Sequence, residues 1–190
     1  MKKIAVIFPG IGYTTDKPIL YYSRKIAMEC DYEEVIPVVY TYKGGNIRGD
    51  RQKIQEAFEA LYVQAKKVLD QVRWEQYGEI LFISKSIGTV VAARYAEETG
   101  LRVRHVLYTP LEAAFLYHPA AALAFIGTKD PWSRPEEIIR QCLASGITVR
   151  GIEDGNHSLE TGSPLADIAT LGMVMKETRQ FLLSEKPQPQ

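Results

Sequence analysis

Short apolar runs alternate with longer amphipathic segments along almost the whole chain. Runs of four to six mainly apolar residues, bounded by glycine, proline or polar residues, are typical of buried strands. They cover 4–8, 35–40, 80–83, 103–108, 122–126 and 147–152. Between them, apolar residues recur at helical spacing over about 18–30, 51–74, 90–99, 135–146 and 165–183. This alternation predicts an α/β fold, with about six mostly parallel strands in one sheet and helices on both faces.

Length and composition fit one globular domain. The chain has 190 residues, of which 46% are hydrophobic and 24% charged. These values are ordinary for a domain with a substantial core. We expect the domain to span 1–185, followed by a loose tail over 186–190 in which proline alternates with glutamine.

Charge and cysteine content narrow the classes of function. Lys+Arg and Asp+Glu both number 23, so the net charge is zero, and neither nucleic acid nor a membrane is an expected partner. Cys30 and Cys142 match no metal-ligand spacing, so we expect reduced, buried thiols and no metal. The first apolar run is too short for a signal sequence, and no run approaches the roughly twenty residues of a membrane helix. A cytoplasmic, enzyme-sized domain is the resulting expectation.

The stretch 78–92 joins the third predicted strand to a tight turn and the start of a helix. Small residues stand at Ser84, Ser86 and Gly88. A nucleophile on a sharp strand-to-helix turn needs small residues two positions before and after it, because strand and helix crowd together there. The stretch therefore fits the nucleophile elbow G-x-S-x-G, with serine in place of the first glycine. The alternative is an ordinary strand-to-helix turn whose serines cap the helix.

A serine, an acid and a histidine follow three of the predicted strands. Ser86 comes after the third strand, Asp130 after the fifth and His157 after the sixth. The carboxyl ends of parallel strands meet at one edge of a sheet, so these side chains can converge there. The order Ser, Asp, His is that of the α/β-hydrolases, and neither of the other two histidines follows a strand end in that order. Asp154 and Glu112 remain alternative acids, and Asp130 could instead open a turn or cap a helix.

Three short motifs resemble those of a small α/β-hydrolase without a lid, similar to the dienelactone-hydrolase-like branch. Residues 84–88 resemble the G-K-S-M-G elbow of that branch, 128–132 its G-x-x-D acid turn and 155–159 its G-x-H-S-L histidine loop. The resemblance extends over about residues 3–184. It implies an α/β-hydrolase fold without a cap domain, since no insertion follows the fourth strand, and hence an open, shallow site.

Together, the serine, the acid and the histidine predict a serine hydrolase that needs no cofactor and cleaves a carboxylic ester or thioester of a small acyl substrate. Ser86 would attack the acyl carbonyl, His157 would accept its proton and Asp130 would orient the imidazole. The oxyanion that forms needs backbone N–H donors. We expect these from Ile87, directly after the nucleophile, and from Ile11 in the Pro-Gly-Ile-Gly loop after the first strand.

Two other classes of function stay open at this point. One is a non-catalytic module on the same fold that binds a small molecule or a protein, since fold does not determine function. The other is a flavodoxin-like phosphate or nucleotide site in loop 9–12. That loop matches neither G-x-G-x-x-G nor the P-loop, and this hypothesis leaves the acid and the histidine unexplained. Tyr13, Trp132 and Glu112 are candidates for the pocket wall or for simple packing. The sequence gives neither acyl length nor oligomeric state.

Overall fold

The computed structural model describes residues 1–45, 47 and 49–184. Its strands are β1 (Lys2–Phe8), β2 (Glu34–Pro37), β3 (Tyr77–Lys85), β4 (Arg104–Tyr108), β5 (Ala122–Gly127) and β6 (Thr148–Ile152). They form one sheet in the order β2-β1-β3-β4-β5-β6, and every neighbouring pair is parallel. The predicted six-stranded α/β architecture is confirmed. The predicted tail over 186–190 lies outside the described residues, so the division of the chain at 185 stays a prediction.

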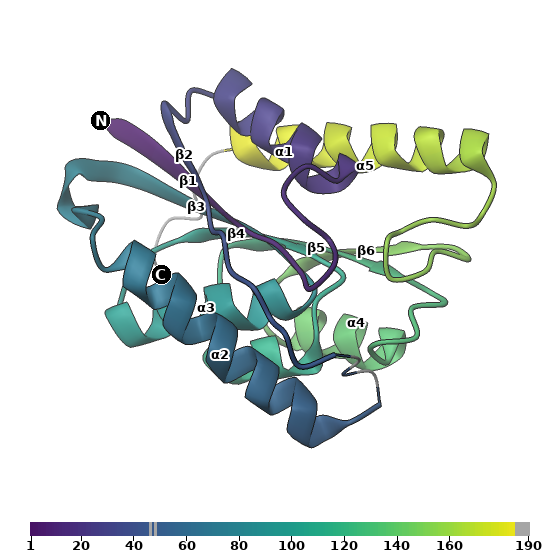
Figure 1. The fold of residues 1–190 in the computed structure, drawn as a ribbon. Coiled ribbons are helices and arrows are strands. Elements are labelled where there is room, and N and C mark those ends of the chain that lie inside the picture. Colours follow the sequence, from purple (N-terminus) through teal and green to yellow (C-terminus); the bar gives the residue numbers. More distant parts are fainter. Residues whose placement is uncertain (46, 48, 185–190) are drawn as a thin grey trace.

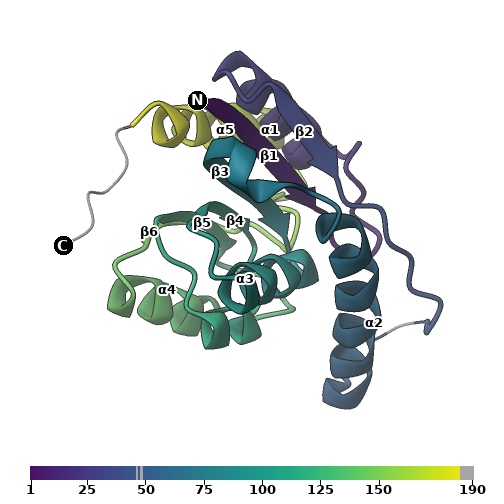
Figure 2. The same ribbon diagram turned by 90° about the vertical axis from the view of Figure 1, so that its left-hand side faces the viewer.

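Helices cover both faces of the sheet, as predicted (Figure 1). One face carries α1 (Pro18–Glu29) and α5 (Pro164–Leu183), and the other carries α2 (Arg51–Leu69), α3 (Ile87–Thr99) and α4 (Pro135–Ala144). Figure 2, seen from the side of the strands' amino ends, shows the same layers with the sheet between them. The connection after β4 holds only a short 3-10 helix, Glu112–Tyr117, so no lid is inserted there.

Two apolar cores form where the helices pack on the sheet. Successive side chains of a strand point to opposite faces. On β1, Ile4, Val6 and Phe8 therefore join the core beneath α2 and α3, whereas Ala5 and Ile7 join the core beneath α1 and α5. A smaller cluster packs α4 against β4 and β5. The four central strands, β1, β3, β4 and β5, are buried on both faces over most of their length, which explains why the sequence shows unbroken apolar runs there in place of alternation.

The third strand is longer than predicted, Tyr77–Lys85 in place of 80–83, and two other elements end earlier than predicted. The second strand ends at Pro37 and not at position 40; it is an edge strand, where proline is tolerated. The long second helix ends at Leu69 and not at 74, and Asp70 is its C-cap. Val72 and Trp74 lie beyond that end yet still pack against the core. Their apolar character continued the helical pattern in the sequence although the helix itself had stopped.

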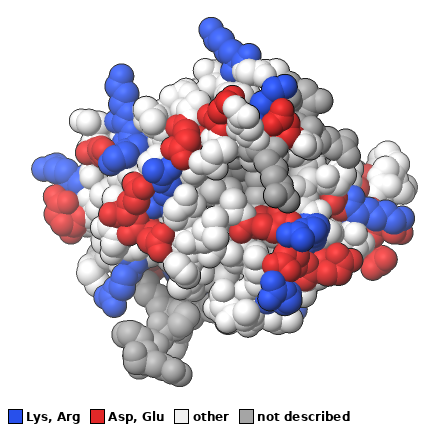
Figure 3. Space-filling model, turned by 90° about the horizontal axis from the view of Figure 1, so that it is seen from below, with Lys and Arg blue, Asp and Glu red and all other residues white. Residues whose placement is uncertain are grey.

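Three surface and burial features complete the fold. No helix in the described ranges is long and apolar enough to cross a bilayer. Both cysteines are buried free thiols, as predicted. On the face that Figure 3 shows, acidic and basic side chains lie close together, which fits the balanced composition.

Candidate active site

Ser86 lies between the last residue of β3 and the first residue of α3, in a backbone conformation that L residues rarely adopt. Its φ is 55° and its ψ is −129°, the kind of strained geometry that functional turns keep. Two glycines allow the main chain to approach this turn. A Cβ on Gly88 would lie 2.5 Å from the carbonyl oxygens of Phe8 and Pro9. A Cβ on Gly10 would lie 3.1 Å from the Cβ of Ser86. The serine is thus held tightly against the end of β1.

Ser84 occupies the position where an elbow usually has glycine. Its side chain is fully buried, and its Oγ donates a hydrogen bond to the carbonyl oxygen of Val106 on β4 at 3.3 Å. The extra hydroxymethyl group therefore has both space and a partner. Serine at this position is compatible with the turn.

Replacing Ser84 with glycine is expected to lower the free energy of unfolding by about 0.5–1.5 kcal/mol. The change removes one hydrogen bond and increases the conformational freedom of the unfolded chain. Urea unfolding of Ser84→Gly beside the wild type measures the difference. A loss above about 3 kcal/mol would mean that Ser84 supports the turn in a way that this single bond does not explain.

Asp130 and His157 meet Ser86 at the carboxyl edge of the sheet. Asp130 follows β5 and His157 follows β6. The Nε2 of His157 lies 2.7 Å from the Oγ of Ser86. Its Nδ1 lies 2.7 Å and 2.9 Å from the two carboxylate oxygens of Asp130. A continuous chain of hydrogen bonds therefore joins the serine hydroxyl to a buried carboxylate through one imidazole.

The two alternative acids are engaged elsewhere. Asp154 forms an exposed ion pair with Lys129 at 2.7 Å. Glu112 accepts hydrogen bonds from the backbone N–H and the side chain of Arg134. In the described part of the chain, Asp130 is the acid that contacts His157.

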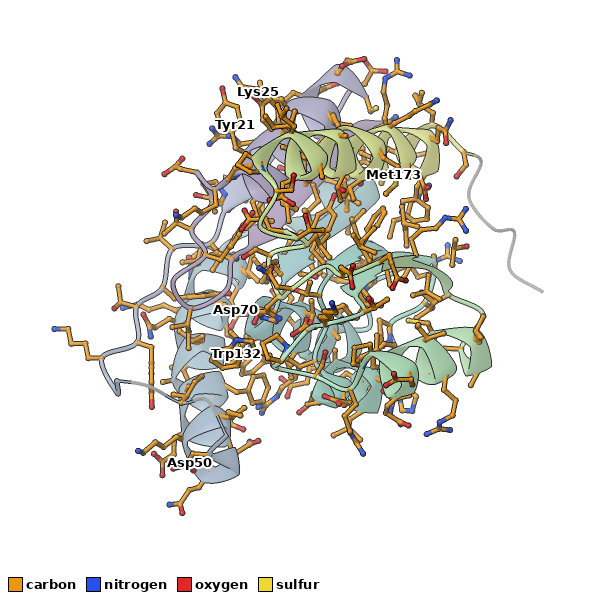
Figure 4. The ribbon with its side chains drawn as sticks, turned by 90° about the vertical axis from the view of Figure 1, so that its right-hand side faces the viewer. Tyr21, Lys25, Asp50, Asp70, Trp132 and Met173 are labelled. Carbon is orange, nitrogen blue, oxygen red and sulfur yellow. The ribbon has the colours of Figure 1, made fainter. Side chains whose placement is uncertain are left out.

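The surroundings of His157 favour its neutral form. Burial lowers the pKa of His157, and the positive charge of Lys85 lowers it further, whereas the hydrogen bond to Asp130 acts in the opposite direction. Trp132 stacks on the imidazole with ring centroids 5.5 Å apart, and its backbone N–H donates to Asp130 at 2.8 Å. Figure 4 faces the strand ends and labels Trp132 near the middle of that edge. A neutral, firmly held imidazole can accept a proton from Ser86.

The two residues predicted as oxyanion donors line the same cavity as Ser86. Ile11 and Ile87 line a cavity of about 260 Å³ together with Ser86 and His157. Ile87 is the first residue of α3, where a backbone N–H has no acceptor within the helix. Other described residues of the wall are Gly12, Tyr13, Ile47, Ile54, Lys85, Leu111, Trp132 and Ser158. The donor role of the two amides stays a prediction. Tyr13, Trp132 and Glu112 were the predicted candidates for the pocket wall. Tyr13 and Trp132 line the cavity, and Glu112 does not.

Lys85 is a residue of this site that sequence reasoning missed. It precedes Ser86 and is fully buried, and its Nζ donates to the carbonyl oxygen of His157 at 2.5 Å. The available signal was a lysine separated from a buried apolar run only by Ser84, a place where a charged side chain is rarely found.

A second hollow lies at the opposite, amino edge of the sheet. Its volume is about 740 Å³, and its wall includes His105, Leu101 and Pro119. Burial lowers the pKa of His105 to about 4. Ser86, Asp130 and His157 are not among the residues that line it, so the larger hollow is not the candidate active site. Among the described residues, no group of three or more His, Cys, Asp or Glu side chains could hold a metal ion.

Comparisons with known proteins identify the fold. No protein-family description and no curated protein sequence matches the chain. Solved structures do match along nearly its whole length. An α/β serine hydrolase without lid from Xanthomonas campestris is 16% identical, with a TM-score of 0.60 over 96% of this chain and 84% of that one.

Two esterases of known structure have a similar fold. A Pyrococcus furiosus esterase is 12% identical, with a TM-score of 0.59 over 95% of this chain and 82% of that one. A Bacillus cereus carboxylesterase is 16% identical, with a TM-score of 0.57 over 95% and 87% of the two chains. The chain therefore has the α/β-hydrolase fold, without a lid, as the motifs implied.

Proposed function

We propose that this protein is a serine hydrolase that cleaves a carboxylic ester or thioester through an acyl-enzyme. The observation that carries the proposal is the pair of 2.7 Å contacts that join Ser86 to His157 and His157 to Asp130. The strained backbone of Ser86 adds support, since it presents the Oγ at the end of the sheet. The likeness to hydrolases and esterases of the same fold agrees with it.

The mechanism follows from these positions. The Oγ of Ser86 attacks the acyl carbonyl while His157 accepts its proton on Nε2, and Asp130 stabilises the imidazolium. The N–H groups of Ile11 and Ile87 donate to the oxyanion of the tetrahedral intermediate. His157 then gives the proton to the departing alcohol or thiol. Water, activated by the same imidazole, hydrolyses the acyl-enzyme and restores the free serine.

The described cavity wall favours a small, uncharged acyl group. A volume of about 260 Å³ lies at or below the lower end of the range for drug-sized ligands. Much of the wall is apolar, with Ile47, Ile54 and Leu111 among its residues. We therefore propose short apolar acyl groups as the substrates.

A fluorophosphonate probe with intact-mass detection tests the proposal. We expect one adduct per chain, located on Ser86 by peptide mapping, and faster hydrolysis of acetyl and butyryl esters or thioesters than of long-chain ones. Well-folded protein that forms no adduct and cleaves no member of the panel would refute the hydrolase. In that case a non-catalytic binding module on this fold would become the better hypothesis.

The rate of probe labelling is expected to fall as the pH drops through an apparent pKa below the 6.5 of an ordinary histidine. Only neutral His157 can accept the proton of Ser86, and burial lowers the pKa of this imidazole. The labelling rate should therefore be nearly independent of pH around pH 7 and should decrease only in more acidic buffer. Labelling rates between pH 4.5 and 8, with the fold monitored by circular dichroism, measure the midpoint. A midpoint above 6.5 with the fold intact would contradict the prediction.

A further inference from the structure

The side chain of Lys85 ends between three separate parts of the fold. Its Nζ donates to the Oγ1 of Thr109, just after β4, at 2.6 Å and to the carbonyl oxygen of His157, after β6, at 2.5 Å. It also lies 4.9 Å from the centre of the Tyr13 ring, in the loop after β1. A single buried amine therefore links the strand of the nucleophile to the loop of the base.

A lysine in this place carries a cost that an apolar side chain would not. The residue is fully buried, and removing an ammonium group from water is unfavourable. An unbranched apolar side chain of similar length could occupy the same space. What an apolar side chain cannot supply is a hydrogen bond to the main chain of His157. That bond acts on the residue whose imidazole must reach Ser86 and Asp130 together.

We propose that Lys85 is a positioning residue of this site: by holding the carbonyl group of His157 it fixes the imidazole between the serine and the carboxylate. The proposal rests on the proposed function and deepens it. Lys85 also lines the cavity, but in this role it acts through His157. Its second bond, to Thr109, fixes the direction in which the amine points. Thr109 itself has a φ of 43°, which places its hydroxyl at an unusual bend after β4.

The charge of Lys85 adds a second effect. The groups that face Lys85 are Asp130, Glu160, Tyr13 and His157. Burial lowers the pKa of Lys85 to about 7, while the two carboxylates act in the opposite direction. When protonated, Lys85 disfavours a second positive charge on His157. Removing the lysine should therefore raise the pKa of His157, whereas loss of a merely structural contact would leave that pKa in place.

The test compares Lys85→Met with Lys176→Met, which removes a lysine from the exposed surface of α5. We expect Lys85→Met to remain folded, with a melting temperature within about 4 °C of the wild type, since the loss of two hydrogen bonds is partly offset by the removal of a buried amine. Its second-order rate of fluorophosphonate labelling should fall about 10- to 100-fold, the scale of a misplaced catalytic group. Lys176→Met should keep the wild-type rate.

A second readout does not depend on activity. The C–H proton signals of the three histidines are followed by NMR during a pH titration, and His157→Gln identifies the signal of His157. In Lys85→Met the pKa of His157 should be higher than in the wild type. Absence of labelling in the wild type would count against the hydrolase alone, because the titration still examines the effect of Lys85 on His157.

Two results would overturn the positioning role. One is a folded Lys85→Met with an unchanged labelling rate; the other is an unchanged pKa of His157. If Lys85→Met does not fold, Thr109→Val removes one of the two acceptors of the amine and keeps the shape of the side chain. A several-fold slower labelling rate in folded Thr109→Val would support the proposal, and a wild-type rate would contradict it.

Discussion

Replacing Ser86 with alanine is expected to abolish probe labelling and to reduce ester hydrolysis by at least about 10⁴-fold. The change removes the one oxygen that lies 2.7 Å from His157 Nε2. Without it, no covalent acyl-enzyme can form, and only the residual effect of binding and oxyanion stabilisation remains. Initial rates on a short-chain thioester and intact-mass analysis after exposure to the probe measure the two effects.

The fold should be unaffected by this change. Apart from its contact with His157, the backbone and Cβ of Ser86 carry the packing of the turn, and alanine keeps both. Ser84→Gly is the matched comparison, two residues earlier and within β3, and it should keep the labelling rate within a few-fold. Persistent labelling of folded Ser86→Ala would mean that another residue is the nucleophile, and the proposed roles of His157 and Asp130 would then have to be abandoned as well.

Much of the site could be predicted because its signals are local. The tight turn at Ser86 requires small neighbours, and these are visible in five consecutive residues. Asp130 and His157 each follow a short apolar run, and parallel strands bring such positions to a common edge. The parallel direction of the strands and the order of the three residues along the chain therefore indicated where they would meet, without any knowledge of side-chain contacts.

Other parts of the site depend on contacts between distant segments and could not be predicted. The partner of Lys85 is a main-chain oxygen 72 residues away, and every residue has such an oxygen, so sequence offers no specific signal for it. Which of Asp130, Asp154 and Glu112 is the acid that pairs with His157 was open for a related reason. Asp154 and Glu112 are excluded because they form ion pairs with Lys129 and Arg134. These ion pairs exist only once the loops are folded.

Gly127 is the position where we expect the largest loss of stability from a single added methyl group. It is the last residue of β5, and a Cβ there would lie 2.1 Å from the carbonyl oxygen of Gly155 and 2.5 Å from its carbonyl carbon. Both are main-chain atoms that cannot rotate away. The same oxygen accepts a hydrogen bond from the N–H of Lys129 at 2.9 Å. The acid turn and the histidine loop therefore meet at a distance that only glycine allows.

Gly127→Ala is accordingly expected to lower the free energy of unfolding by about 2–4 kcal/mol, at or above the usual range for overpacking a filled interior. Labelling of Ser86 should slow by about 100-fold, because separating the two loops moves His157 away from Asp130. Urea unfolding and labelling rates at a temperature where the variant is folded measure both losses.

Gly172→Ala in α5 is the matched control, since a Cβ there meets nothing within 4 Å. It should leave labelling unchanged and raise the free energy of unfolding by about 0.5–1 kcal/mol, because alanine is the better helix former. If Gly127→Ala were as stable as this control, separating the acid turn from the histidine loop would have to cost little free energy. A wild-type labelling rate in the same variant would show in addition that the pairing of His157 with Asp130 does not depend on their close contact.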